Sequence, residues 1–214
     1  MRLPLFPLST VLFPGGVLPL RIFEARYMDM ARDCLRDEQP FGVCMITDPK
    51  GTEVSRNVHF ADVGCSALIS AWDMRQLGLL HVRAVGGQRF RVLEAGTQDN
   101  GLKVAEIEWI DDDEDTPVAL EHAPCVDLLR RIIDDLRAQA AERRREQADD
   151  EEDVLTQVPF EEPFRLDSSS WVSNRLCEVL PVPLKAKQKL MELADGHARL
   201  QIVHTYLKQH AVFK

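Results

Sequence analysis

The stretch that decides the fold begins with LPLFPL at residues 3–8 and VLFPGG at residues 11–16, and it continues with VLPL at residues 17–20 and IFEARY at residues 22–27. Proline has no backbone N–H to donate to a ladder, so residues 3–8 are expected to form an edge strand or an extended arm. Pro14-Gly15-Gly16 predicts a turn, and residues 17–20 predict a second short strand. The start of the chain is therefore predicted to be β-structure interrupted by proline.

Further short strands and one helix are predicted before residue 110. Residues 41–46 form a short apolar run, and residues 63–71, 80–84 and 105–109 alternate in the manner of strands. Gly86-Gly87 allows a turn, kink or bulge, and Asn100-Gly101 favours a hairpin with a type I′ turn. One amphipathic helix is indicated by apolar residues at helical spacing, namely Tyr27, Met30, Ala31, Cys34 and Leu35.

The second part of the chain is helical in pattern. An acidic run at residues 111–115 separates it from the first part, and five like charges in a row are expected to stay solvated as a linker. Asp167-Ser168 predicts a helix N-cap, and Asp195-Gly196 predicts a glycine C-cap between two later helices. We therefore predict a β-rich subdomain at residues 1–110, an acidic linker at 111–124 and a helical bundle at 125–214.

Composition argues against two classes of partner. The formal net charge of −9 and the pI of about 5.2 lower the expectation of nucleic-acid binding, which draws its affinity from basic patches. No apolar run reaches the roughly 18 residues that a membrane-spanning helix needs. Four prolines interrupt the apolar start of the chain, so it does not have the form of an export signal, and we expect a cytoplasmic protein without membrane association.

The chemical motifs of common enzymes are missing. The sequence holds no GxxxxGK[ST] phosphate loop, no GxSxG nucleophile elbow and no HExxH zinc motif. The five cysteines are odd in number and form no CxxC pair, which favours buried reduced thiols. His197 and His204 lie two helical turns apart, too far for one metal ion without other ligands. We therefore expect no enzymatic activity, no cofactor and no metal site.

The opening motifs resemble those of the Lon protease N-terminal domain family, whose pattern is LPLFPL, then vlFPg, then lPL and iFE.RY. Further matches are FGV at residues 41–43, VGCSA at 63–67, GQRFRV at 87–92 and LPVP at 180–183. The resemblance covers nearly the whole chain, although Ala25 stands where the family often has proline. It implies an α+β fold, in which a β-rich pseudobarrel related to the PUA domain, with an inserted helix, precedes a helical bundle.

The resemblance also implies a role in recognising exposed protein segments. Full Lon proteases add an ATPase and a Ser-Lys peptidase, so we expect a free-standing binding module whose partners are unfolded polypeptide and, as a further candidate, a separate ATP-dependent protease. A free strand edge beside an apolar groove accepts an extended peptide by strand addition. The candidate peptide-binding residues are Pro14, Arg21, Phe23, Arg26 and Tyr27.

Two alternatives remain open from the sequence. Aromatic residues are usually buried for packing, so Phe6, Phe13, Phe23 and Tyr27 are better explained one by one as core, with Glu24 and Arg26 as a structural ion pair. The other alternative is an RNA-binding protein of PUA-like fold. Its basic strip would consist of Arg75, Arg83, Arg89 and Arg91, with Trp72 for base stacking.

The missing phosphate loop and nucleophile motifs generate the first prediction. The purified 214-residue chain is expected to show neither ATP hydrolysis nor peptidase activity, measured by phosphate release and by cleavage of a fluorogenic peptide. Steady ATP turnover that a point mutation in this chain abolishes would contradict it.

Overall fold

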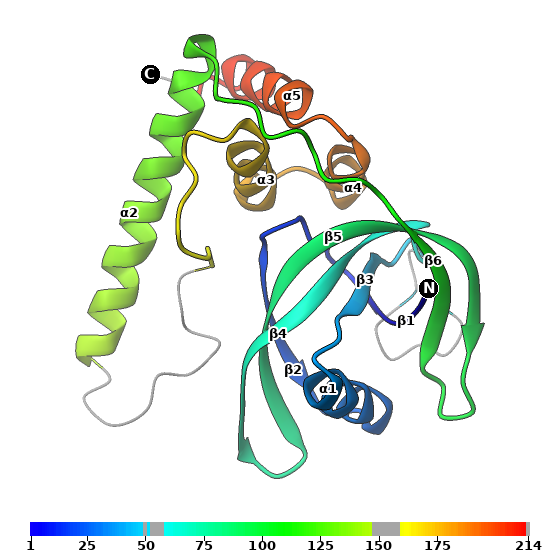
Figure 1. Cartoon of the computed structure of the whole chain (residues 1–214). Helices are drawn as coiled ribbons and strands as arrows, with labels where there is room; N and C mark the ends of the chain where they lie inside the picture. The colour runs from blue at the N-terminus through cyan, green and yellow to red at the C-terminus, as the bar shows by residue number, and fades with distance from the viewer. Residues whose placement is uncertain (49–50, 52–57, 147–158, 213–214) are drawn as a thin grey trace. The chain divides into compact units, whose positions relative to one another are not determined.

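The structure, a computed structural model, describes residues 1–48, 51, 58–146 and 159–212 (Figure 1). The chain divides into two compact units, Met1–Asp112 and Asp113–Lys214, and each unit is described by itself. The first unit contains the β-strands and one helix, and the second is helical. None of the described helices combines the length and the apolar character needed to cross a membrane.

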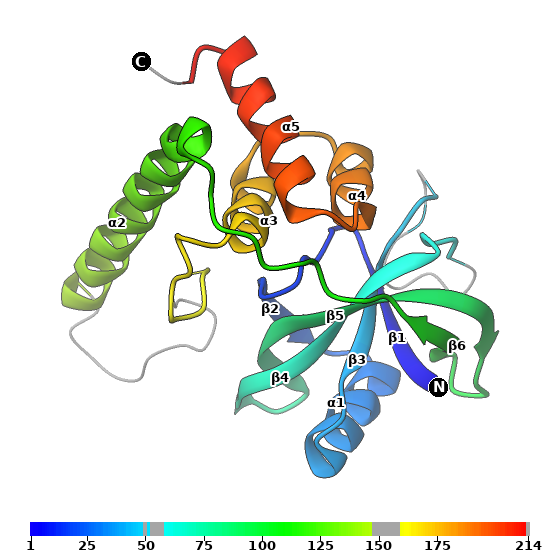
Figure 2. The same cartoon turned by 45° about the horizontal axis from the view of Figure 1, so that its top comes forward.

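The first unit is a curved six-stranded sheet that wraps a core against one helix (Figures 1 and 2). Its order is β2-β5-β4-β3-β1-β6, and β5 also pairs with β6, as in a barrel. The elements are β1 (Arg2–Leu8), β2 (Val17–Ile22), α1 (Ala25–Asp37), β3 (Phe41–Met45), β4 (Val63–Gln76), β5 (Leu79–Thr97) and β6 (Lys103–Trp109). The predicted strands and the inserted helix are confirmed.

The prediction that residues 3–8 form an edge strand or arm is wrong, because β1 lies between β3 and β6. Its first half pairs with β6 and its second half pairs with β3. The N–H of Ile107, in β6, donates to the carbonyl of Met1, and the N–H of Ile46, just after β3, donates to the carbonyl of Leu8. Backbone groups of successive residues in a strand point to opposite sides, so these two bonds fix the side that each residue of β1 faces. The backbone nitrogen of Pro4 therefore faces β3, but the ladder with β3 starts only at Leu5. The backbone nitrogen of Pro7 faces β6, but the ladder with β6 has already ended at Leu5. Neither proline removes a ladder hydrogen bond.

The structure decides the predictions made at two glycine-containing pairs. At Gly86-Gly87 the strand continues, and the register moves from Ala67↔Gly86 to Cys65↔Arg89, so the bulge alternative is correct. At Asn100-Gly101 the hairpin is present, but the type I′ turn is wrong. A type I′ turn needs positive φ at both residues, but Gly101 has a φ of 87° whereas Asn100 does not have a positive φ. The N–H of Gly101 donates to the carbonyl of Gln98. One αL residue after the turn, rather than two within it, gives the strands their twist.

In the described part of the second unit there are a short 3₁₀ turn and four helices (Figure 2). They are η1 (Leu120–His122), α2 (Ala123–Glu146), α3 (Ser169–Val179), α4 (Leu184–Glu192) and α5 (Gly196–Gln209). Helices α3, α4 and α5 lie together, and the long α2 runs alongside α3. Residues 147–158 of the predicted bundle lie outside the described residues.

The helix ends show one confirmed cap and one correction. The hydroxyl of Ser168 accepts the N–H of Trp171, which confirms the predicted N-cap of α3. Asp195-Gly196, in contrast, is not a C-cap: the carboxylate of Asp195 caps the N-terminus of α5 and Gly196 is its first residue. A Cβ at Gly196 would lie 2.6 Å from the Cα of Ser170, so glycine is needed where α5 approaches α3.

The acidic run is not uniformly solvated, contrary to expectation. The Asp113 side chain is only 5% exposed and forms a 2.7 Å ion pair with Arg199, which is 1% exposed. The hydroxyl of Ser170 also donates to Asp113, and Asp115 accepts the hydroxyl of Ser168 at 2.6 Å. Asp113 is the counter-ion that a buried guanidinium needs, so the start of the predicted linker is part of the helical unit.

The buried pair generates a stability prediction. Replacing Asp113 by Ala leaves the Arg199 guanidinium buried without its counter-ion, and we expect a loss of about 3–5 kcal/mol in the free energy of unfolding of the second unit. Thermal and urea denaturation measure it. The matched control is Asp112→Ala at the exposed neighbouring position, which should change stability by less than about 0.5 kcal/mol. Equal effects of the two substitutions would contradict the prediction.

Candidate peptide-binding groove

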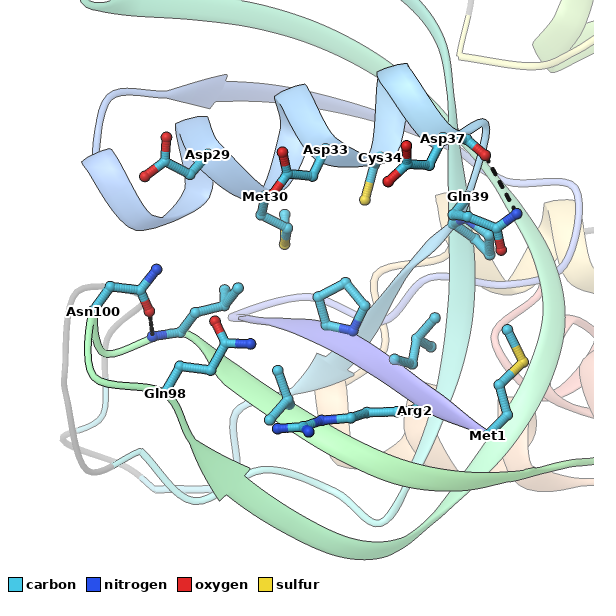
Figure 3. Close-up of a pocket in the computed structure, with 15 residues that line it drawn as sticks. Met1, Arg2, Asp29, Met30, Asp33, Cys34, Asp37, Gln39, Gln98 and Asn100 are labelled. Atoms are coloured by element: carbon cyan, nitrogen blue, oxygen red, sulfur yellow. Dashed lines mark hydrogen bonds between the residues drawn. The ribbon is translucent and has the colours of Figure 1, made fainter.

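An open groove of about 360 Å³ in the first unit is the main candidate site (Figure 3). Three elements line it: α1, the start of β1, and the turn that joins β5 to β6. Met30 and Cys34 point from α1 into the groove, and Gln98 faces them from the turn. Leu3, Pro4, Leu102 and Val104 add apolar surface, so most of the lining is apolar.

A row of three carboxylates forms the α1 rim of the groove. Asp29, Asp33 and Asp37 are spaced four residues apart, and all three line the groove. Arg32 pairs with Asp29 at 2.9 Å, and Arg36 pairs with Asp33 at 3.0 Å and with Asp37 at 2.6 Å. The hydrogen bond from Arg36 lowers the pKa of Asp37. Both arginines are exposed and neither lines the groove, so the groove itself faces the carboxylates.

The one thiol in the groove is a poor nucleophile. Burial, together with the nearby charges of Asp33 and Asp37, raises the pKa of Cys34 to about 11. Burial likewise raises the pKa of Cys125 to about 12. All five cysteines are buried thiols, which confirms the sequence prediction of buried reduced cysteines. The thiol of Cys34 therefore contributes apolar surface to the groove rather than reactivity.

Arg26 positions one end of the groove. Its guanidinium pairs with Glu24 at 2.9 Å and donates to the carbonyl of Gly101 at 3.0 Å. The Asn100 side chain accepts the N–H of Leu102, which fixes the same turn. Arg26 thereby holds the turn, which bears the lining residues Gln98 and Asn100, against the start of α1.

The floor of the groove includes a short open strand edge. The ladder between β1 and β3 starts at Leu5↔Gly42, and the backbone of Arg2 faces that side without a strand partner within the described part of the chain. This edge is shorter than the sequence suggested, because most of β1 is paired. An apolar groove beside exposed backbone groups and carboxylates suits an extended segment with apolar and basic side chains.

Of the five predicted site residues, only Arg26 and Tyr27 are seen in contact within the described structure, with the Arg26 guanidinium 4.6 Å from the centroid of the Tyr27 ring. Tyr27 is 3% exposed and stacks on Phe6 with ring centroids 4.0 Å apart, so it belongs to the core. Phe13 is also fully buried. Arg26 is buried and paired with Glu24, and it reaches the groove only through Gly101. The packing alternative therefore describes Phe6, Phe13, Tyr27 and the Glu24–Arg26 pair.

The other three predicted residues lie away from the groove. Pro14 is half-buried in the turn whose neighbour Gly15 donates to the carbonyl of Gly86. Arg21 is exposed on β2 opposite His81, and Phe23 is 64% exposed just after that strand. Phe23 is thus an exception to the packing alternative. It has a free aromatic surface, as a contact residue requires.

A second exposed apolar surface surrounds the end of the β4–β5 hairpin. Trp72 and Leu77 are 57% and 94% exposed, and Leu68 and Met74 are also exposed. The β3 ladder on β4 ends at Phe41↔Ala67, so in the described structure β4 pairs only with β5 beyond that point. This open strand edge is a second surface to which an extended segment can add.

The basic strip of the RNA alternative is broken in the structure. Arg83 and Arg89 are 6% and 1% exposed, whereas Arg75 and Arg91 are exposed. Arg89 donates to the carbonyl of Asp111 at 3.1 Å, so its guanidinium serves the fold. Trp72 is exposed, but two surface arginines do not form the basic track that binds a phosphate backbone.

The second unit gathers histidines rather than a recognisable metal centre. The ring of His122 lies 5.4 Å from that of His197 and 5.1 Å from that of His204, measured between centroids. Nε2 of His122 is 2.7 Å from the side-chain oxygen of Gln201. Within the described ranges no group of three or more His, Cys, Asp or Glu side chains is arranged to hold a metal ion.

Sequence reasoning missed the groove residues Asp29, Asp33, Gln98 and Asn100. Asp29 and Asp33 fall between the apolar positions that predicted this helix, and Asn100 was assigned to a hairpin turn, where the structure places it. The pattern did contain one signal: Asp29 and Asp33 each directly precede an apolar residue of the buried stripe, Met30 and Cys34. Such boundary positions form the rim of a groove when another element lies opposite.

Comparison with known proteins agrees with the fold and with the opening motifs. The family model of the ATP-dependent protease La (LON) substrate-binding domain matches residues 2–209. Cereblon of Danio rerio is 33% identical over 112 residues, which cover 50% of this chain and 25% of cereblon. The Lon protease of Anaeromyxobacter dehalogenans (strain 2CP-C) is 26% identical over 214 residues, covering 94% of this chain and 22% of the protease. The chain thus spans about a quarter of the length of these relatives.

Solved structures give the same result. The Lon N-terminal domain protein from Xanthomonas campestris is 32% identical with a TM-score of 0.71, over 96% of this chain and 98% of that one. The N-terminal domain of Mycobacterium avium complex Lon protease, 13% identical with a TM-score of 0.60 over 98% and 100% of the two chains, shares the fold. The PUA-like β-rich fold with a helical C-terminal part defines a Lon-type substrate-recognition module. This chain belongs to the Lon substrate-binding domain family.

The positions of two nearby aromatic residues generate a prediction. Replacing the buried Tyr27 by Ala should cost about 3–5 kcal/mol of stability, because it leaves a cavity against Phe6. Replacing the exposed Phe23 by Ala should change stability by about 0.5 kcal/mol or less. Urea denaturation of the 214-residue chain measures both. A stable Tyr27→Ala variant with weakened peptide binding would instead restore Tyr27 as a contact residue.

Proposed function

We propose that this chain is a non-catalytic adaptor or regulator of proteolysis that binds unfolded or exposed polypeptide segments. The observation that carries the proposal is the groove beside β1, with its apolar lining, its short open strand edge and its carboxylate rim. The family supports a substrate-recognition role. A separate ATP-dependent protease is the partner to which such an adaptor would deliver a bound chain.

The groove favours an extended occupant over a folded surface. Its volume of about 360 Å³ is in the range that holds a few side chains rather than a domain face. Apolar side chains of the occupant would pack on Met30, Leu102 and Val104. Ordering a flexible chain costs conformational entropy, so the affinity is expected to be on the order of micromolar or weaker.

The carboxylate rim gives the groove a charge preference. Asp29 and Asp33 are each about half exposed, with side-chain exposure of 49%, and Arg32 and Arg36, which pair with them, do not line the groove. Arg2 does line it, so the three carboxylates of α1 outnumber the one guanidinium among the described lining residues. A lysine or arginine of the occupant would therefore meet carboxylates without displacing an arginine. We propose that basic, apolar segments bind more tightly than acidic ones of equal apolar content, and that this difference falls as salt rises.

The test uses two fluorescent ten-residue peptides in which valine alternates with lysine or with glutamate. Fluorescence anisotropy with the 214-residue chain should show tighter binding of the lysine peptide. The double variant Asp29→Lys and Asp33→Lys should weaken that binding by about tenfold or more, since like charges at one site repel. Loss of the three exposed ion pairs that these two aspartates form should cost only about 1–3 kcal/mol of stability.

The matched control is Asp127→Lys on α2. Asp127 pairs with Arg130 at the same i,i+3 spacing on an exposed helix surface, but it lies in the other unit. It should leave lysine-peptide binding unchanged. If Trp72→Ala abolishes binding and the α1 variant does not, the β4–β5 hairpin is the site and the groove proposal is wrong. No binding of either peptide or of a reduced, alkylated protein would overturn polypeptide recognition and leave a dedicated folded partner.

A further inference from the structure

The second unit contains a separate groove that the proposed function does not use. It lies between α4 and α5 and has a volume of about 500 Å³. Almost all of its lining is apolar. Ile202 lines it with 49% of its surface exposed, and Leu184, at the start of α4, is 40% exposed. Exposed large apolar side chains beside a groove are typical of a binding surface.

The walls of this groove are two helical stripes. On α4 and just after it, Ala186, Leu190 and Leu193 recur at the i, i+4, i+7 spacing of one helix face. On α5, Ile202 and Tyr206 follow at i, i+4. Such stripes present ridges and grooves into which the side chains of a third helix fit.

The backbone of the walls selects the form of the occupant. Helix backbone groups bond within their own helix, so α4 and α5 offer no strand edge along these stripes. An extended segment would bury N–H and C=O groups there without partners, which is costly. A helix satisfies its own backbone and presents only side chains. The geometry therefore favours a helical occupant with an apolar stripe.

The positive charge on α4 favours a helical occupant with acidic residues beside its apolar stripe. Lys189 is the one charged residue among those described as lining the groove, and its side chain is 80% exposed. Lys185 lies one turn earlier and is also exposed. Helix α4 carries three lysines against one glutamate, Glu192, in a chain whose net charge is −9. Glu192 pairs with Lys189 at 2.6 Å and offsets part of this charge.

From these observations we propose that the α4–α5 groove is a docking site for an amphipathic helix of a partner protein, with acidic residues flanking its apolar face. The docking mode is that of a helix laid into an apolar groove between two helices. The site is independent of the groove beside β1, because it lies in the other unit and takes a different backbone conformation. It gives the chain a means of recruiting one partner while the first unit holds another.

The test uses three fluorescent 18-residue peptides with the same leucine stripe. One is flanked by glutamates, one by lysines, and one is the glutamate peptide with a central proline that breaks the helix. Anisotropy with the 214-residue chain should show saturable binding of the glutamate peptide. Binding should be about tenfold weaker for the lysine peptide, from charge, and weaker still for the proline peptide, from lost helix.

Three variants assign the binding to this groove. Ile202→Glu should weaken glutamate-peptide binding by about tenfold or more, because it places a carboxylate in the apolar wall. Leu120→Glu, at a leucine of the same unit that is 94% exposed and does not line the groove, should leave it unchanged. Lys189→Glu should shift the preference toward the lysine peptide. It removes only an exposed ion pair and should leave the fold intact.

Several outcomes would overturn the proposal. Binding that survives Ile202→Glu places the site elsewhere. If the proline peptide binds as tightly as the glutamate peptide, the occupant need not be helical. If the lysine and glutamate peptides bind equally, the preference for acidic flanks is wrong. No saturable signal at protein concentrations on the order of 1 mM rejects the docking site itself. The variants Asp29→Lys and Asp33→Lys should leave glutamate-peptide binding unchanged, so failure here is distinct from failure of the groove beside β1.

Discussion

The pairing of β1 is the constraint on which the first unit depends. One strand joins β6 through its first half and β3 through its second half, so it closes the sheet between segments far apart in sequence. Pro4 and Pro7 are tolerated because each faces the side on which its half of the strand has no ladder. The same division leaves Arg2 beside open space, which is why the groove lies at this end of the strand.

Local structure was readable from the sequence because it depends on neighbours within a few residues. Alternation predicted the strands, helical spacing predicted α1 and α5, and the preference for Ser at a helix N-cap located the start of α3. Long-range placement was not readable in this way. Proline indicated an edge strand, and only the pairing of β6 with β5 and β1 shows why β1 is interior. Asp113 likewise appeared solvated until α5 brought Arg199 to it.

The candidate site was harder to predict than the fold for the same reason. The motif that identifies the family is largely a packing motif, since Phe6, Phe13 and Tyr27 are buried. Of the five residues chosen from it, two are buried and the other three lie away from the groove. The groove is lined instead by residues of ordinary appearance, such as Asp33 and Gln98, that come from different elements. Their meeting depends on Arg26, whose bond to Gly101 spans 75 residues.

The ion pair between Asp113 and Arg199 joins residues 86 positions apart, near the two ends of the second unit. During synthesis the aspartate leaves the ribosome long before its partner exists. Until α5 has emerged, Asp113 lacks its counter-ion, and Ser173 and Asn174 lack the guanidinium that donates to them. The helical unit can therefore reach its final packing only when its last helix is complete. The first unit meets a similar requirement earlier in synthesis, because β6, with which β1 pairs, ends at Trp109.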